Sequence, residues 1–190
     1  MGLSGAFMQA AGSHKGEKFE GMLLFATVVD PEIESITGTD IVVTTTKNGE
    51  SKTETYAELS GETLSISADK NTKIAITGMI TECKIGINTT FTRILSTNTA
   101  LTSLDCSYCS ALQELNLSTN TALTSLNCSE CSALQELKYP ATNENVSMKI
   151  AGAITDAAAA DGTVYPDSAA DYYSTIADAA TEKGWNIEQL

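Results

Sequence analysis

The sequence predicts a mainly β protein with C-terminal helices, arranged around a short parallel β-solenoid. The first observation is a tandem repeat, in which residues 96–117 (STNTALTSLDCSYCSALQELNL) are followed at once by the near-identical residues 118–139. The second is a period of 11 residues inside that repeat, at Leu101, Leu112, Leu123 and Leu134. Self-similarity at a fixed short period is the signature of stacked repeat architectures. We therefore expect each 22-residue repeat to form one coil of a solenoid.

The repeating unit reads L-x-x-L-x-[L/C/Y]-S-x-[N/C]-[S/T]-A. Its alternation places Leu104 and Cys106 on the inner side of a short strand and Asp105 on the outer side. At the turns, the side-chain amides of Asn98 and Asn120 are expected to satisfy backbone groups that would otherwise be buried unpaired. One unit cannot bury its leucines alone, so stacked units must share a core. Each buried leucine then contributes roughly 1.5–3 kcal/mol.

This unit resembles the leucine-rich repeat family, whose consensus is L-x-x-L-x-L-x-x-N/C-x-L. It is most similar to the bacterial variety with nested eleven-residue periodicity, found in secreted and cell-surface proteins. The resemblance covers residues 96–139 and implies a short leucine-rich repeat parallel β-solenoid with a strand on both sides of each coil. The repeat is short, however, and the long concave surface of that family is not expected here.

Four segments are predicted along the chain. Residues 1–17 are expected to be a flexible leader or arm. Residues 18–70 should form a small antiparallel β unit that caps the solenoid, because Asn48-Gly49 joins the Thr-rich runs 41–47 and 50–56 and is a strong hairpin signal. The solenoid itself is placed at residues 71–150, with residues 73–95 as a degenerate coil.

Residues 151–190 are predicted to form an α/β C-terminal cap. Val146, Met148 and Ile150 alternate like a last inward-facing strand before it, and the Ala-rich run 151–160 indicates a helix ended by Gly162. A strand at 163–165 and a second helix up to Lys183 should follow, the latter opened by a capping box of Ser168 with Asp171. Gly184 would end that helix before a last strand at 185–190. The residues expected to cover the end of the core are Tyr172, Ile176 and Trp185.

The cysteines allow two interpretations. Cys106, Cys109, Cys128 and Cys131 have the C-x2-C-x18-C-x2-C spacing of a four-cysteine zinc site. The repeat offers another explanation, since Leu117 and Asn120 occupy the same positions in the alternate unit. A position that accepts leucine or asparagine has no metal requirement, and cysteine packs as a small hydrophobic residue. Buried free thiols are thus the favoured interpretation, with zinc and disulfides as alternatives and no cofactor expected.

Charge excludes several classes of partner. The chain has 11 Lys and Arg against 24 Asp and Glu, a net charge of −13, so a nucleic-acid partner is not expected. No apolar run is long enough for a transmembrane helix.

The single histidine, His14, lies in the leader, far in sequence from any candidate nucleophile, and an enzyme is therefore not expected.

Two outward strand faces remain as candidate sites. The residues chosen for binding are short and polar: Thr102, Ser103, Asp105, Thr124, Ser125 and Asn127. The opposite face would carry longer and more charged side chains: Gln113, Glu114, Asn116, Gln135, Glu136 and Lys138. The leading hypothesis is a non-enzymatic module that binds a protein or a carbohydrate, in a bacterial protein that is extracellular or on the cell surface. The alternative is a structural spacer or assembly component, and an enzyme is the third hypothesis.

Overall fold

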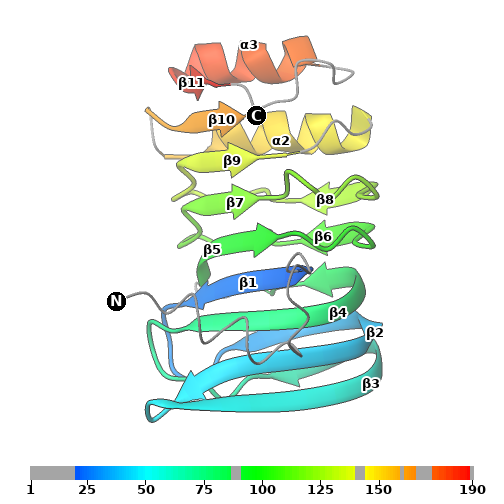
Figure 1. Cartoon of the computed structure of the whole chain (residues 1–190). Coiled ribbons are helices and arrows are strands. Elements are labelled where there is room, and N and C mark those ends of the chain that lie inside the picture. The colour runs from blue at the N-terminus through cyan, green and yellow to red at the C-terminus, as the bar shows by residue number, and fades with distance from the viewer. Residues whose placement is uncertain (1–19, 87–90, 140–143, 159–160, 166–172, 189–190) are drawn as a thin grey trace.

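A computed structural model describes residues 20–86, 91–139, 144–158, 161–165 and 173–188. These described residues form one eleven-stranded sheet whose strands stack along a common axis, with two helices at its C-terminal end (Figure 1). The predicted mainly β class with C-terminal helices is therefore confirmed. The sheet is mixed and mostly antiparallel, so a parallel solenoid does not describe it as a whole. Parallel pairing involves the repeat and the strands next to it.

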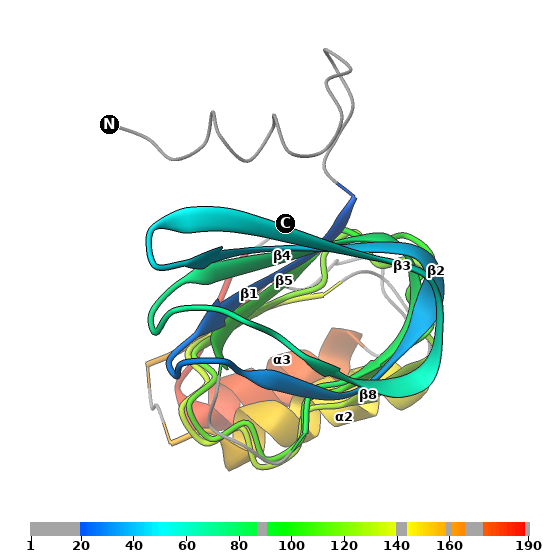
Figure 2. The same cartoon turned by 90° about the horizontal axis from the view of Figure 1, so that it is seen from below.

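The first four strands are antiparallel. They are β1 (Gly21–Ala26), β2 (Glu32–Lys47), β3 (Glu50–Ser65) and β4 (Lys73–Lys84). The hairpin predicted at Asn48-Gly49 is confirmed, since both residues have positive φ (54° and 77°) and Lys47 pairs with Glu50. Its strands are much longer than the Thr-rich runs suggested, and breaks in the β2–β3 and β2–β4 registers accompany their curvature around the end of the stack (Figure 2).

Strand β4 connects this N-terminal part to the repeat. Its first residues pair antiparallel with β1, whereas its last three pair in parallel with β6, which aligns Cys83 with Leu104. Strand β1 lies between β4 and β5 and is antiparallel to both. The segment predicted as a degenerate coil therefore supplies the first strand of each of two ladders.

The repeat continues these two ladders. Its strands are β5 (Phe91–Ser96), β6 (Ser103–Asp105), β7 (Glu114–Asn116), β8 (Ser125–Asn127) and β9 (Glu136–Lys138). Ser103 pairs with Ser125 and Glu114 pairs with Glu136, so parallel neighbours are one 22-residue repeat apart. Each repeat thus contributes one strand to the β4–β6–β8 ladder and one to the β5–β7–β9 ladder.

The interior between the ladders is apolar, as the unit predicted. The nine repeat leucines are all buried: Leu101, Leu104, Leu112, Leu115, Leu117, Leu123, Leu126, Leu134 and Leu137. At the turns, the amide Nδ2 of Asn98 donates to the Gly78 carbonyl at 2.7 Å, and that of Asn120 donates to the Asn98 carbonyl at 2.7 Å. The predicted role of these asparagines in pairing buried backbone groups is confirmed.

The strand predicted at Val146, Met148 and Ile150 is wrong, because these residues belong to helix α2 (Glu144–Asp156). Val146 and Ile150 are buried one helical turn apart, together with Ile154, whereas Met148 is 53% exposed. In a helix, residues i and i+4 share a face and residue i+2 lies opposite. A strand would bury all three residues at i, i+2 and i+4, whereas a helix buries only i and i+4. The exposure of Met148 is therefore what distinguishes the helix from the predicted strand.

After α2 come β10 (Thr163–Tyr165), α3 (Tyr173–Lys183) and β11 (Asn186–Ile187). The strand at 163–165 and the helix end at Lys183 are confirmed. Gly184 has φ 82°, and Trp185 N donates to the Ala180 carbonyl at 2.8 Å, the pattern of a glycine-terminated helix. Ile176 and Trp185 are buried as expected, while Ser168, Asp171 and Tyr172 lie outside the described residues.

Candidate interaction faces

The two ladders present two outer faces on different sides of the stack. Figure 2, along the stack axis, shows β1 and β5 on one side and β8 with α2 on the other. We call the outer surface of β6 and β8 the small-residue face, and the outer surface of β5, β7, β9 and β10 the charged face. Strand β10 pairs in parallel with β9, so the charged face extends beyond the repeat.

The small-residue face contains all six residues chosen from the sequence. Strand pairing aligns Ser103 with Ser125 and Asp105 with Asn127. Thr102 and Thr124 directly precede these strands, and Thr124 N donates to the Thr102 carbonyl at 2.9 Å. The structure thus brings the six residues together.

Most of these side chains form hydrogen bonds within the chain itself. Asp105 Oδ1 accepts from the Ser107 hydroxyl at 2.7 Å, and Asn127 Oδ1 accepts from the Ser129 hydroxyl at 2.9 Å. The Thr102 hydroxyl donates to the Thr81 carbonyl at 3.0 Å. These groups stabilise the turns after the strands and the stacking of coils, so they are less available to a ligand than the sequence suggested.

The charged face is hollowed by an open depression of about 330 Å³. The depression is lined by Arg93, Gln113, Glu114, Gln135, Glu136 and Thr163. These residues come from successive coils, because Arg93 pairs with Glu114, Glu114 with Glu136, and Glu136 with Thr163. Four of the six belonged to the face not chosen from the sequence. Arg93 and Thr163 lie outside the clear repeat, and strand pairing places them on this face.

Ion pairs balance the charges of this depression. Arg93 forms an ion pair with Glu114, and Lys138 Nζ lies 2.7 Å from Glu136 Oε1. The hydrogen bond to Glu136 raises the pKa of Lys138. Two cations and two carboxylates in one row leave the face locally neutral, although the whole chain has a net charge of −13.

Aromatic rings flank the row at both ends. The Arg93 guanidinium lies 4.9 Å from the centre of the Phe25 ring, and Lys138 Nζ lies 4.5 Å from the centre of the Tyr165 ring. Cations above aromatic faces are held by the ring quadrupole. The side chains of Arg93 and Lys138 are therefore held in position.

The five cysteines are all buried and unpaired. Three of their thiols face backbone carbonyls: Cys131 Sγ lies 3.2 Å from the Cys106 carbonyl oxygen, Cys128 Sγ lies 3.6 Å from that of Lys149, and Cys109 Sγ lies 3.8 Å from that of Gly86. Burial raises the pKa of Cys83 to about 12 and that of Cys109 to about 12. Among the described residues, no group of three or more His, Cys, Asp or Glu side chains is arranged to hold a metal ion.

Comparisons of the chain with protein-family models, with curated proteins and with solved structures find no match. Within the described part of the chain, no helix is both long and apolar enough to cross a membrane. The candidate faces must therefore be judged from their own chemistry.

Proposed function

We propose that the chain is a non-enzymatic interaction module of the leucine-rich repeat type, part of a bacterial surface or secreted protein. It recognises a protein or a carbohydrate through the outer faces of its strands. What carries the proposal is the depression on the charged face, where Gln113, Glu114, Gln135 and Glu136 form a two-by-two array on adjacent strands.

The chemistry of this array suits recognition. Parallel strands are about 4.8 Å apart, so equivalent side chains repeat at that spacing. Gln113 and Gln135 are exposed and carry both donors and acceptors, whereas the neighbouring glutamates are acceptors held by Arg93 and Lys138. A partner that fits this array would present hydroxyl, amide or ammonium groups at a matching spacing.

The small-residue face is the second candidate surface. Its hydroxyl and carboxylate groups are largely occupied by the turns, which leaves Ser103 and Ser125 as the central outward pair. We rank it below the charged face for this reason.

The test is binding of the full chain to arrays of immobilised glycans and of cell-surface proteins. For a ligand found there, Gln113→Ala/Gln135→Ala should weaken binding by about tenfold or more, since each lost hydrogen bond contributes roughly 0.5–1.5 kcal/mol. Thermal unfolding should be unchanged because both side chains are exposed. The matched control is Ser103→Ala/Ser125→Ala on the other face, which should bind like the parent chain.

The structural alternative makes a different prediction. A spacer without a specific ligand would bind nothing on either array. Binding that is equally strong in both double variants would show that the charged face is not the binding surface. Either result would contradict the proposed recognition by the charged face. The observation that favours a role in assembly is the edge strand β3, which is the last strand in the sheet order.

A further inference from the structure

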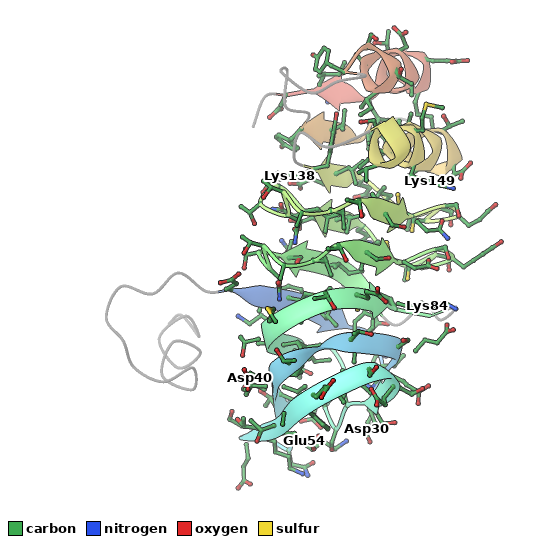
Figure 3. The ribbon with its side chains drawn as sticks, turned by 90° about the vertical axis from the view of Figure 1, so that its right-hand side faces the viewer. Asp30, Asp40, Glu54, Lys84, Lys138 and Lys149 are labelled. Atoms are coloured by element: carbon green, nitrogen blue, oxygen red, sulfur yellow. The ribbon has the colours of Figure 1, made fainter. Side chains whose placement is uncertain are left out.

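Strand β3 is an open edge of the sheet. It is the last strand in the sheet order, and among the described residues it pairs only with β2, so no described strand lies on the other side of its backbone. Residues 50–58 are exposed apart from the half-buried Tyr56. Figure 3 shows Glu54 at the end of the molecule opposite the helices, so the edge faces away from the stack.

The hairpin determines which backbone groups of β3 point outward. In a two-residue hairpin, the residues that flank the turn exchange both of their hydrogen bonds, and such pairs then alternate along the ladder. Lys47 and Glu50 are that flanking pair, so Glu50, Lys52, Glu54 and Tyr56 bond to β2. The backbone N–H and C=O groups of Ser51, Thr53, Thr55 and Ala57 consequently point to the open side.

We propose that this edge pairs with the β3 edge of a second copy of the chain. The two strands run antiparallel and are centred on Thr55, which gives a two-fold symmetric dimer with one sheet running through both copies. In this register Thr55 bonds to Thr55 of the second copy, and Thr53 bonds to Ala57. All of these residues belong to the set whose backbone groups point outward.

Charge complementarity favours this register over its two immediate neighbours. Centred on Thr55, Lys52 faces Glu58 of the second copy at two symmetric positions, Glu54 faces Tyr56, and no like charges are opposite one another. Centring one residue earlier would place Glu54 opposite Glu54 and Glu50 opposite Glu58. Centring one residue later would place Glu54 opposite Glu58. Like charges directly opposite one another destabilise a strand pair, whereas opposite charges stabilise it.

The same charges disfavour pairing with acidic strands. Edge strands of natural proteins carry charged residues that prevent unspecific pairing. An edge with Glu50, Glu54 and Glu58 repels acidic strands in most registers, and the net charge of −13 opposes close approach of two copies elsewhere. The inference is independent of the proposed ligand recognition, which uses the outer side of β5, β7, β9 and β10.

A charge-swap series tests the register by sedimentation velocity at increasing concentrations of the full chain. The parent chain should form a dimer. Lys52→Glu and Glu58→Lys should each weaken it by roughly tenfold, since each creates two like-charge pairs in place of two attractive ones. The double variant Lys52→Glu/Glu58→Lys should restore it. A parent chain that stays monomeric throughout, or a double variant no better than the single ones, would overturn the proposal.

A second variant tests the geometry. Thr55→Cys places an exposed thiol on the symmetry axis, and the natural cysteines are all buried. A short thiol-reactive crosslinker should then link two copies, whereas Glu62→Cys, beyond the proposed overlap, should be linked far less. Equal linkage of both variants would contradict the register. Thermal unfolding of each variant shows that its fold is unchanged.

Discussion

At the scale of single residues, the cysteines show how a repeat changes the meaning of a motif. Taken alone, C-x2-C-x18-C-x2-C indicates zinc. Taken with Leu117 and Asn120, it indicates two buried positions that tolerate several side chains. In the structure Cys106 and Cys109 are both buried. A hydrogen bond with Cys131, together with burial, raises the pKa of Cys106, and burial raises the pKa of Cys109.

These thiols predict a loss of stability at alkaline pH. An ordinary cysteine has a pKa near 8.5, while those of Cys83 and Cys109 in the fold are about 12. The folded state therefore keeps protons that the unfolded chain releases, and the associated stability is complete below pH ~8.5 and lost as the pH rises toward 12. Urea unfolding across this range should show a steady fall of the unfolding free energy.

Two measurements accompany this titration. At neutral pH, alkylation should be slow in the native protein and should reach all 5 cysteines only after unfolding. The variant Cys83→Val should lose less stability over the same alkaline range, because one titrating thiol is absent. Stoichiometric zinc in the purified protein would contradict the interpretation as free thiols.

At the scale of elements, local signals predicted the strands better than the helices. The Asn48-Gly49 turn and the 22-residue repeat determine strand positions, because positive φ and regular leucine spacing leave few alternatives. The start of α2 carried no such signal. The spacing of Val146 and Ile150 fits both the two-residue period of a strand and the turn of a helix. In the structure this segment is a helix that contacts β8. The hydrogen bonds of Asp105 to Ser107 and of Asn127 to Ser129 were also not predicted. The sequence did contain a signal for them, because three strands end in an Asp or Asn that stands two residues before a serine.

The orientation of α2 predicts unequal effects of two substitutions. Ile150→Lys places a charge in a fully buried position and should cost more than about 3 kcal/mol, because an unpaired buried charge is strongly unfavourable. Met148→Lys should stay within about 0.5 kcal/mol of the parent, since Met148 is 53% exposed. Chemical unfolding measures both. Similar large losses in the two variants would support the inward-facing strand that the sequence suggested.

At the scale of the whole molecule, the coils change type along the stack. In the repeat each coil has two strands, whereas α2 and α3 follow β9 and β10 on the side where β6 and β8 lie (Figure 1). Lys183 Nζ donates to the Thr155 carbonyl at 3.1 Å, which ties α3 to α2. The sequence predicted this cap because its composition differs from the repeat, but it could not predict that the charged face continues onto Thr163. The segment between β9 and β10, which contains α2, does not follow the 22-residue period. Only the pairing of Glu136 with Thr163 shows that β10 continues the charged face.

Closure of the stack at this end depends on a tight contact between Gly162 and Trp185. A Cβ atom on Gly162 would lie 2.3 Å from Cε2 of the Trp185 ring, which is only 4% exposed. Gly162→Ala should therefore push the ring out of place and cost about 1–3 kcal/mol, the range for overpacking a dense core. Because Trp185 is the single tryptophan, its fluorescence should shift toward longer wavelength in this variant.

Gly152 provides the matched control for this substitution. It lies on the exposed side of α2, and a Cβ atom there would meet nothing within 4 Å. Gly152→Ala should raise the unfolding free energy by about 0.5–1 kcal/mol through helix propensity alone, with unchanged tryptophan emission. Urea unfolding followed by fluorescence measures both variants. If Gly162→Ala also stabilised the protein without an emission shift, Trp185 would not be packed against Gly162, and the cap would have to close the core in another way.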